Sequence, residues 1–244
     1  MPRKPVSLGW GIRREGRTLW SRNSTRGKSV GNERRKRDGR IEWRQWDPSR
    51  SKVAAALLIT SQKASELLPG PGDTCLYLGA SSGTTVSHIH DMVCGSNNHH
   101  NGQIIAVEIS PRMMRDLSSL AEDRPGLIPI LTDARETPSY APLMREKAHW
   151  IHQDLSIADQ AENFITIARS TLQAGGIGLL SLKAASERHS EGDDFSRFSS
   201  AEKLLKESEL ELVERIDISK FQDQHVVFVA VSYTHLTLPT NGTV

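Results

Sequence analysis

The chain has 244 residues, of which 37% are hydrophobic and 25% are charged. This length and composition suit one globular core with a small appended unit. No apolar run approaches the roughly 18 residues that a membrane-spanning helix needs, so we expect no membrane partner and no targeting segment. The two cysteines, Cys75 and Cys94, have neither metal-ligand spacing nor a disulfide pattern, which predicts a cytoplasmic setting and no metal site.

The net charge of +2 is unevenly distributed along the chain. Residues 1–50 hold 15 Lys and Arg against 5 Asp and Glu, whereas the remaining residues hold 16 against 24. A basic N-terminal region beside an acidic body indicates an anionic polymer as a partner, and a solvated, disordered tail is the alternative. Trp20, Trp43 and Trp46 lie among these arginines, where they either pack a small sheet or stack on bases, and for Trp43 we expect packing.

Residues 1–46 are expected to form a small antiparallel β unit. Its turns are predicted at 27–31 and 34–40, and an alternating strand at 41–46. Asp47 and Pro48 then predict a helix start, with a helix over 51–67 that ends before the Pro-Gly repeat at 69–72. We therefore expect a β unit over 1–46, a main domain over 47–231 and a separate segment over 232–244.

The main domain alternates strands and helices. Strands are expected at 74–78, 103–108, 127–131, 149–153 and 176–182, and helices at 84–93, 111–123, 140–146, 158–171 and 199–207. Two closing strands, at 210–217 and 225–231, are expected to pair as a hairpin. The alternation predicts an α/β fold with a parallel Rossmann-like sheet, helices on both faces and an antiparallel C-terminal edge strand.

The first strand of this sheet leads into a glycine-rich turn at 79–85, Gly-Ala-Ser-Ser-Gly-Thr-Thr. Such a turn lets a ligand approach the backbone closely and offers it the unpaired N–H groups of a helix start. The G-x-x-x-G spacing matches neither the G-x-G-x-x-G of dinucleotide-binding proteins nor a P-loop, which carries a lysine. Taken alone, the turn is equally compatible with an ordinary strand-to-helix connection.

Polar residues at the ends of the other strands decide between these two interpretations. Glu108 ends the second strand, Asp133 follows the third, Asp154 follows the fourth and Lys183 follows the fifth. Ligands bind at the carboxyl ends of such strands, where Glu108 can accept both hydroxyls of a ribose and Asp133 an exocyclic amine. The pattern predicts a nucleoside-binding crevice, and the absence of a pyrophosphate fingerprint favours S-adenosylmethionine over NAD.

These motifs resemble the fibrillarin family, especially its archaeal members. The resemblance is collinear from residue 8 to residue 231 and rests on the glycine turn and on the stretches 27–30, 43–52, 106–112, 128–134, 154–160 and 225–227. Fibrillarins are S-adenosylmethionine-dependent RNA 2′-O-methyltransferases that act within box C/D ribonucleoprotein particles. The resemblance therefore implies a class I methyltransferase sheet, this cofactor and this activity on rRNA or tRNA, in an archaeal-type cell.

The resemblance also implies the residues that bind and the residues that catalyse. The cofactor-binding set is Gly79, Ala80, Gly83, Thr84, Thr85, Glu108, Ile109, Asp133, Ala134, Asp154, Leu155, Ser156 and Ile157. The catalytic set is Lys52, Asp154, Lys183 and His225. Because a ribose 2′-hydroxyl is a poor nucleophile, we assign its activation to Lys183 and its orientation to Asp154, with Lys52 and His225 in supporting or phosphate-positioning roles.

The partners implied by the resemblance are a box C/D guide RNA, its rRNA or tRNA target, a Nop5-type scaffold protein and an L7Ae-type RNA-binding protein. In this chain Ile157 replaces a family glutamine, Gln224 replaces an aspartate before His225, and residues 97–101 lengthen a short connection. Two alternatives stay open: a stand-alone RNA methyltransferase, and an RNA-binding subunit that has lost catalysis. Residues 232–244 resemble translated sequencing-adapter read-through, and we predict that they are a non-native or disordered tail without a role.

Overall fold

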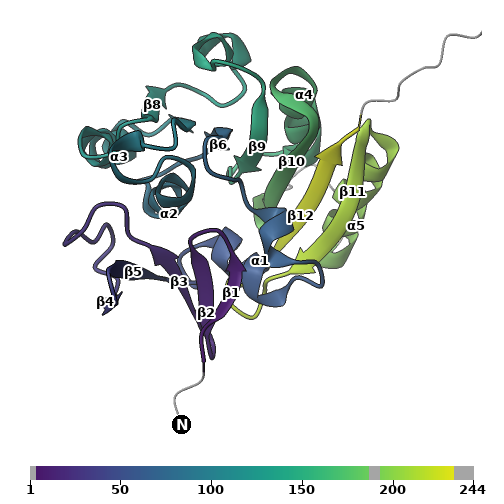
Figure 1. The fold of residues 1–244 in the computed structure, drawn as a ribbon. Coiled ribbons are helices and arrows are strands. Elements are labelled where there is room, and N and C mark those ends of the chain that lie inside the picture. Colours follow the sequence, from purple (N-terminus) through teal and green to yellow (C-terminus); the bar gives the residue numbers. More distant parts are fainter. Residues whose placement is uncertain (1–3, 187–192, 234–244) are drawn as a thin grey trace, which may run out of the picture.

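The computed structural model of the chain describes residues 4–186 and 193–233, which form two β-sheets and their surrounding helices (Figure 1). The strands are β1 (Val6–Gly9), β2 (Ile12–Glu15), β3 (Thr18–Arg22), β4 (Arg35–Asp38), β5 (Ile41–Trp46), β6 (Thr74–Leu78), β7 (Gln103–Glu108), β8 (Leu127–Leu131), β9 (Ala148–Gln153), β10 (Leu172–Lys183), β11 (Leu210–Asp217) and β12 (His225–Ser232). The helices are α1 (Lys52–Ile59), α2 (Thr84–Val93), α3 (Pro111–Glu122), α4 (Gln160–Thr171) and α5 (Asp194–Glu207).

The larger sheet has seven strands in the order β11-β12-β10-β9-β6-β7-β8. The five strands from β10 to β8 run parallel, as the alternation of strands and helices predicts. β12 runs antiparallel to both β10 and β11, so the closing hairpin completes the sheet and β11 forms its outer edge. The predicted α/β fold with a Rossmann-like sheet is confirmed, and the strand order reverses between β6 and β9, where such sheets bind ligands.

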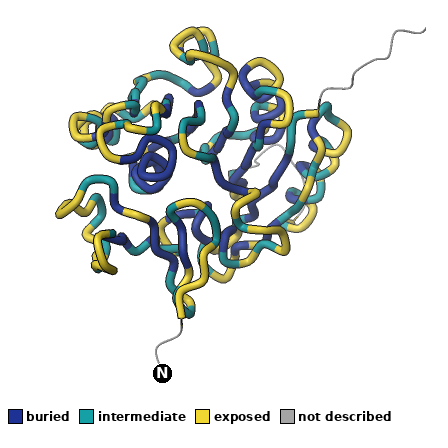
Figure 2. The backbone as a smooth tube through the Cα atoms, in the orientation of Figure 1, coloured by how far each residue is buried: buried dark blue, intermediate teal, exposed yellow. Residues whose placement is uncertain are grey.

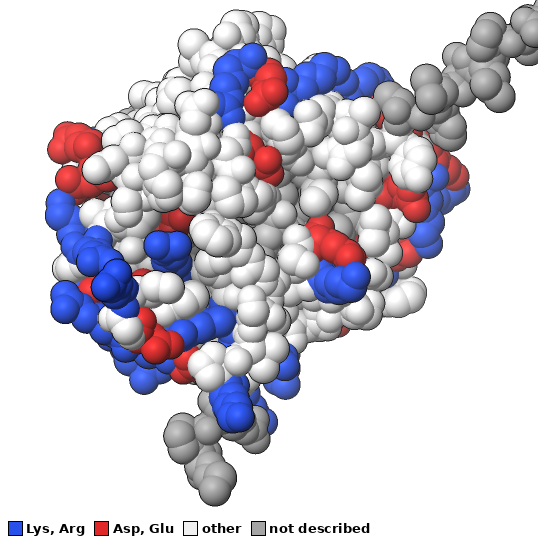
Figure 3. All heavy atoms as spheres, viewed as in Figure 1, with Lys and Arg blue, Asp and Glu red and all other residues white. Residues whose placement is uncertain are grey.

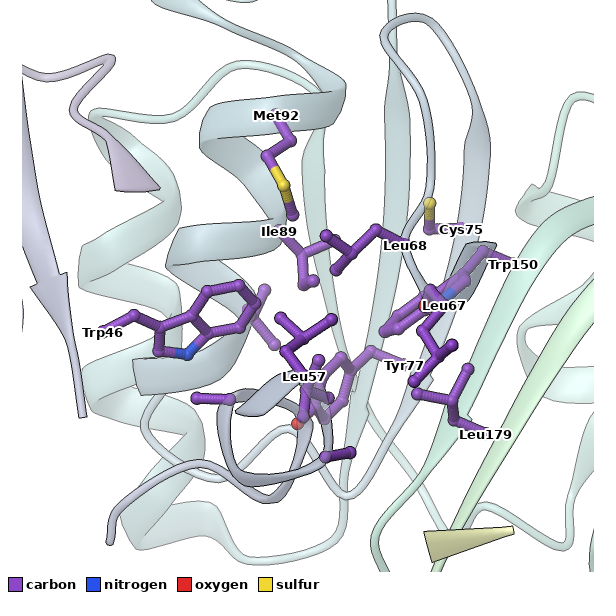
Figure 4. Packing of buried hydrophobic residues seen from close by; sticks show 14 of the residues in the cluster. Trp46, Leu57, Leu67, Leu68, Cys75, Tyr77, Ile89, Met92, Trp150 and Leu179 are labelled. Atoms are coloured by element: carbon purple, nitrogen blue, oxygen red, sulfur yellow. Dashed lines mark hydrogen bonds between the residues drawn. The ribbon is translucent and has the colours of Figure 1, made fainter. Parts of the chain in front are cut away.

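Helices cover both faces of the larger sheet. On one face α1, α2 and α3 share a buried cluster with the smaller sheet, and Figure 4 shows members of it: Trp46, Leu57, Tyr77, Ile89, Trp150 and Leu179. On the other face α4 and α5 enclose a second cluster, which includes Phe164, Phe198 and Phe228. Figure 2 shows that buried residues follow the central strands and α2, while exposed residues lie on the outer loops.

The smaller sheet is antiparallel, with the order β1-β2-β3-β5-β4, and it packs on α2. Arg44 of β5 places Nη2 2.6 Å from Oδ2 of Asp91 in α2, and Arg124 places Nη1 2.7 Å from Oδ1 of the same carboxylate. Burial raises the pKa of Asp91, but the two guanidinium groups outweigh burial and hold that pKa well below its ordinary value. A buried, charged contact therefore joins the N-terminal sheet to helix α2.

The three tryptophans of the basic region are buried side chains, each 9% exposed or less. The packing predicted for Trp43 is confirmed, since the guanidinium of Arg13 lies 4.0 Å from the centroid of its ring. Trp46 stacks on His88 of α2 at a centroid distance of 4.9 Å. Packing rather than base stacking is thus the role of all three side chains.

The predicted helix over 51–67 is wrong beyond Ile59. Thr60 and Ser61 leave the helix because their hydroxyls donate hydrogen bonds to Glu214 of β11, and residues 64–67 form only a 3-10 turn. The predicted helix start at Asp47 and Pro48 is also wrong. The Ser51 side chain caps α1 instead, because its oxygen accepts from the Ala54 N–H.

Two other local predictions are wrong because tertiary contacts override the sequence pattern. The basic run at 34–40, expected as a turn, contains strand β4, where Lys36 and Asp38 pair with Glu15 and Arg13 of β2. The helix expected over 140–146 is replaced by two 3-10 turns at 137–139 and 141–143. The chain then turns extended, and the Arg145 N–H donates to the Gln103 side chain.

β12 continues to Ser232, which pairs with Leu210 of β11, so the strand passes the expected domain end at 231 by one residue. Most of the predicted tail, residues 234–244, lies outside the described residues. The division into a β unit, a main domain and a tail stays a prediction. Among the described residues, no helix has the length and apolar character to cross a membrane.

Candidate cofactor and catalytic site

Gly79 and Gly83 shape the turn that follows β6. Their φ angles, 82° and 87°, lie in the left-handed region that favours glycine. A Cβ atom on Gly79 would stand 2.1 Å from the carbonyl oxygen of Asp154, and one on Gly83 would stand 2.4 Å from Cδ2 of Leu120. Gly79 therefore lets the end of β6 contact the segment after β9, whereas Gly83 lets the start of α2 pack against α3.

Glu108, the last residue of β7, is held by two backbone donors. The Ser81 N–H donates to Oε2 at 2.7 Å, and the Ser110 N–H donates to Oε1 at 2.8 Å. A carboxylate has about four lone-pair sites, so Glu108 keeps acceptor capacity for a ligand. The glycine turn and the end of β7 thus present one fixed carboxylate.

A cavity of about 380 Å³ opens at the carboxyl ends of the central parallel strands, within the range of about 300–1,000 Å³ typical of small-molecule sites. It is lined by nine residues of the predicted cofactor-binding set: Gly79, Glu108, Ile109, Asp133, Ala134, Asp154, Leu155, Ser156 and Ile157. Four further residues complete the lining: Ser81, Val107, Thr132 and Arg135. The sequence did not predict these four residues, and the only feature that indicates them is their position next to predicted cofactor-binding residues.

The remaining predicted cofactor residues, Ala80, Gly83, Thr84 and Thr85, do not line the cavity. Thr85 is 8% exposed and its hydroxyl lies 3.0 Å from that of Ser51, the residue that caps α1. It also hydrogen-bonds with Tyr77. Thr85 therefore connects α2 to α1 and β6.

Asp133 forms the far wall of the cavity together with Arg135. The Arg135 guanidinium places Nη2 2.5 Å from Oδ2 and Nε 3.0 Å from Oδ1, and the Arg135 backbone N–H donates to Oδ1 at 2.9 Å. The side-chain hydrogen bonds from Arg135 lower the pKa of Asp133. Asp133 is therefore an ionised acceptor in a fixed orientation.

Lys52 and Asp154 form an ion pair beside this cavity. Nζ of Lys52 lies 2.8 Å from Oδ2 of Asp154, and the two side chains are 18% and 27% exposed. The Ser51 cap places Lys52 in the first turn of α1, and the Asp154 N–H donates to the Leu78 carbonyl at 2.9 Å. Two predicted catalytic residues from distant segments therefore meet at the cavity.

Lys183 and His225 are partners across the antiparallel strands β10 and β12. His225 Nδ1 lies 2.5 Å from the carbonyl oxygen of Asp223. Because a carbonyl oxygen only accepts, Nδ1 carries a hydrogen, and in the neutral ring Nε2 keeps its lone pair. The structure thus assigns the tautomer of this histidine.

Electrostatics link all four predicted catalytic residues. Burial lowers the pKa of His225, and the cations Lys52 and Lys183 lower it further, while the Asp223 carbonyl and Asp154 oppose them. The net effect is a pKa below the ordinary value of 6.5, so the ring is neutral at pH 7. Lys52, Asp154, Lys183 and His225 therefore share one electrostatic neighbourhood.

Gln224 contributes its backbone to this arrangement. It adopts φ of 55°, and its carbonyl oxygen accepts the Ala184 N–H at 3.1 Å. The adjacent Asp223 carbonyl orients the imidazole of His225. The histidine is therefore oriented by a backbone hydrogen bond.

His152 is a buried polar residue near this site that sequence reasoning did not select. It lies two residues before Asp154 on β9, with Nε2 2.8 Å from the Ser181 hydroxyl and its ring edge-on to Tyr77 at 4.7 Å between centroids. Burial lowers its pKa to about 4, so the ring is uncharged at neutral pH. Side chains alternate between the two faces of a strand, so the spacing of two residues predicts that His152 lies on the same face as Asp154.

Known proteins are similar to this chain in sequence. A sequence model of the family described as Fibrillarin matches residues 10–234. The fibrillarin-like rRNA/tRNA 2′-O-methyltransferase of Methanocaldococcus jannaschii is 34% identical over 227 residues, which cover 93% of this chain and 92% of that protein.

Two solved structures are similar over almost the whole chain. Aeropyrum pernix fibrillarin in complex with natively bound S-adenosyl-L-methionine has 31% identity and a TM-score of 0.78, covering 94% of this chain and 100% of that one. The matching chain in a fibrillarin/Nop5p complex has 28% identity and a TM-score of 0.79, covering 93% of this chain and 100% of that one.

Proposed function

Because this chain belongs to the fibrillarin family, we propose that it transfers the methyl group of S-adenosylmethionine to a ribose 2′-hydroxyl of RNA, either rRNA or tRNA. The observation that carries this proposal is the position of Asp154, which lines the strand-end cavity and pairs with Lys52 at 2.8 Å. One carboxylate thereby joins the cavity that holds the methyl donor to the cluster of catalytic side chains.

The cavity fits S-adenosylmethionine in its donors and acceptors. Glu108 offers a fixed carboxylate to two ribose hydroxyls, and Asp133 offers one to an exocyclic amine. Gly79 leaves room that a Cβ atom would close, since that atom would collide with the Asp154 backbone. When bound, the cofactor supplies an electrophilic methyl group on a sulfonium sulfur.

The catalytic side chains of this protein then act on the RNA hydroxyl. Lys183 stabilises the negative charge that the attacking oxygen acquires, and Asp154 and Lys52 hold each other in position beside it. His225 accepts the hydroxyl proton on Nε2, because its Nδ1 hydrogen is already donated to the Asp223 carbonyl. Proton transfer of this kind contributes about 10²–10⁴-fold to a rate, and alignment of the reacting atoms adds to it.

The five-stranded sheet supplies a surface for RNA phosphates. Figure 3 shows Lys and Arg gathered over β4 and β5 on one side of the molecule. Exposed side chains there include Arg26, Arg35, Arg37 and Arg40, and three of them border a small hollow. Contacts from arginine to phosphate fix the position of an RNA without reading its sequence.

The sequence of the target is read by other components of the proposed particle. We place the chain in a box C/D ribonucleoprotein with a guide RNA, a Nop5-type scaffold and an L7Ae-type protein, in the cytoplasm of an archaeal-type cell. The similarity to a fibrillarin crystallised with Nop5p supports the scaffold. Pairing with a guide leaves the enzyme only backbone and shape contacts to make, which agrees with its arginine-rich surface.

Calorimetry with S-adenosylmethionine, followed by transfer of a labelled methyl group to RNA, tests the proposal. Binding of the cofactor, and transfer that requires guide and scaffold, is the expected result. Transfer without guide or scaffold would instead assign a stand-alone enzyme. Cofactor binding without transfer under any assembly, unchanged by Lys183→Ala, would assign an RNA-binding subunit without catalysis, in keeping with Ile157 in the cavity wall.

A further inference from the structure

Trp10 is the exposed tryptophan of this chain. Its side chain is 51% exposed, whereas the other four tryptophans, Trp20, Trp43, Trp46 and Trp150, are 9% exposed or less. It lies in the turn between β1 and β2. Tryptophan is enriched at interfaces because its ring is apolar while its N–H is polar, so this exposed indole is a candidate contact for a ligand.

Two side chains contact the Trp10 ring, and a third packs on one of them. His100 meets it edge-on with 5.8 Å between ring centroids, and His99 lies 3.8 Å from His100. The guanidinium of Arg22, from β3, lies 5.8 Å from the Trp10 centroid. Together these four residues, which we call the Trp10 cluster, combine aromatic rings with a fixed positive charge.

The loop that carries the two histidines is held rigidly. Asn98 exchanges two hydrogen bonds with the Gly102 backbone, at 3.0 and 2.8 Å, and the Ser96 hydroxyl donates to the Ser24 carbonyl at 2.8 Å. A Cβ atom on Gly95 would lie 2.2 Å from His99 Cε1, so the imidazole packs directly on the glycine backbone. The cluster is therefore preorganised, which reduces the entropy lost on binding.

The Trp10 cluster is separate from the methyl-transfer site. Its histidines precede β7, at the amino edge of the parallel sheet, while Glu108 ends β7 at the cavity. Six residues of strand span roughly 20 Å between the two edges. A ligand of the cluster is thus distinct from the cofactor and from the nucleotide being methylated.

We propose that the Trp10 cluster is a stacking site for an unpaired nucleobase of a bound RNA. Aromatic rings bind bases of any identity through stacking, and a nearby guanidinium adds attraction for base and phosphate. The cluster is polar around the ring, with Arg22 and two imidazoles as its neighbours, which favours a base over the apolar surface of a protein partner. Two of its members, Trp10 and Arg22, also belong to the basic N-terminal region, which attracts RNA. The inference rests on the proposed RNA substrate.

Binding of two labelled RNA decamers tests this proposal, namely decaadenylate and a decamer of the same length with abasic riboses. We expect Trp10→Ala to weaken decaadenylate binding about 5- to 100-fold, equivalent to about 1–3 kcal/mol for one stacked base. Trp10→Phe keeps an aromatic face and should lose much less. The abasic decamer should bind the wild-type protein and Trp10→Ala equally.

Equal decaadenylate binding by the wild-type protein and Trp10→Ala would overturn the proposal, as would equal weakening for both decamers. Loss of affinity for the scaffold protein with unchanged RNA binding would also overturn it and assign the cluster to a protein contact. His100→Asn, which leaves the indole in place, provides a second variant should Trp10→Ala fail to fold. Calorimetry with S-adenosylmethionine distinguishes failure of the stacking site from failure of the proposed methyltransferase function, because the cofactor should bind Trp10→Ala as tightly as the wild-type protein.

Discussion

Lys52 and Asp154 stand 102 positions apart in the chain, yet Nζ of the lysine lies 2.8 Å from Oδ2 of the aspartate. The cap at Ser51 and the backbone hydrogen bond from Asp154 to Leu78 bring the two side chains to the same edge of the sheet. Ion pairs with this degree of solvent exposure contribute only about 0–1 kcal/mol to folding. The pair therefore matters for the position of charge beside the cavity more than for stability.

Asp154→Asn should reduce methyl transfer by at least about 10²-fold while changing the melting temperature little, because it removes a charge beside the reacting groups. Glu209→Gln is the matched control. It also removes one carboxylate from an ion pair, but that pair, with Arg169, is exposed and does not include a predicted site residue. That control should keep full activity. Equal activity of Asp154→Asn and wild-type protein would contradict the catalytic role of Asp154.

The pH dependence of methyl transfer should report His225. In the proposed mechanism its neutral form accepts the proton, and its pKa lies below 6.5, with burial as the largest cause. Activity should therefore rise as pH increases through a midpoint below 6.5 and stay level at neutral pH. The initial rate between pH 4.5 and 8 measures this profile.

His225→Asn should lose most of the activity together with this acid limb. A variant that kept the same acid limb would show that another group accepts the proton. Circular dichroism across the same pH range provides the control, because loss of fold at low pH would produce a similar decline in rate.

Gly79→Ala should both destabilise the protein and weaken cofactor binding. The new Cβ atom would collide with the Asp154 carbonyl oxygen at 2.1 Å and displace the segment that carries the aspartate. Gly175→Ala is the matched control, because Gly175 has φ of 73° but no atom within 4 Å of the new Cβ.

Gly175→Ala should lose only about 1–2 kcal/mol of unfolding free energy, from backbone strain, and should keep its cofactor affinity. Urea unfolding and calorimetry measure the two effects. If both variants lost the same stability and kept the same affinity, the close approach at Gly79 would have no functional consequence.

Asp91→Asn should cost about 3–5 kcal/mol of unfolding free energy, because Arg44 and Arg124 would remain buried without their shared carboxylate. Asp123→Asn changes a partly exposed carboxylate paired with Lys28 and should cost less than about 1 kcal/mol. Urea denaturation of both variants checks the difference. Similar losses would mean that the buried charges do not hold the N-terminal sheet on helix α2.

Much of the site was predictable because a parallel sheet brings the carboxyl ends of its strands to one edge. Glu108, Asp133 and Asp154 could be placed there from strand order alone. The orientation of the Thr85 side chain was not predictable, since it depends on a hydrogen bond to the hydroxyl of Ser51, which caps α1.

Other features needed coordinates because they depend on contacts between distant segments. The length of α1 follows from Glu214 on the far strand β11, and β4 pairs with β5 while its charges find partners on β2. The tautomer of His225 follows from one carbonyl oxygen two residues away, in a turn whose left-handed Gln224 has no strong sequence signal.

The most direct test of the account is methyl transfer to two guide-paired RNA targets that differ only in the 2′-hydroxyl of the target nucleotide. The reaction contains the full chain, labelled S-adenosylmethionine, the guide and the scaffold proteins. The account predicts label on the ribose of the normal target and none on the 2′-deoxy target. Equal labelling of both targets, or label on a base, would contradict ribose 2′-O-methylation by this protein.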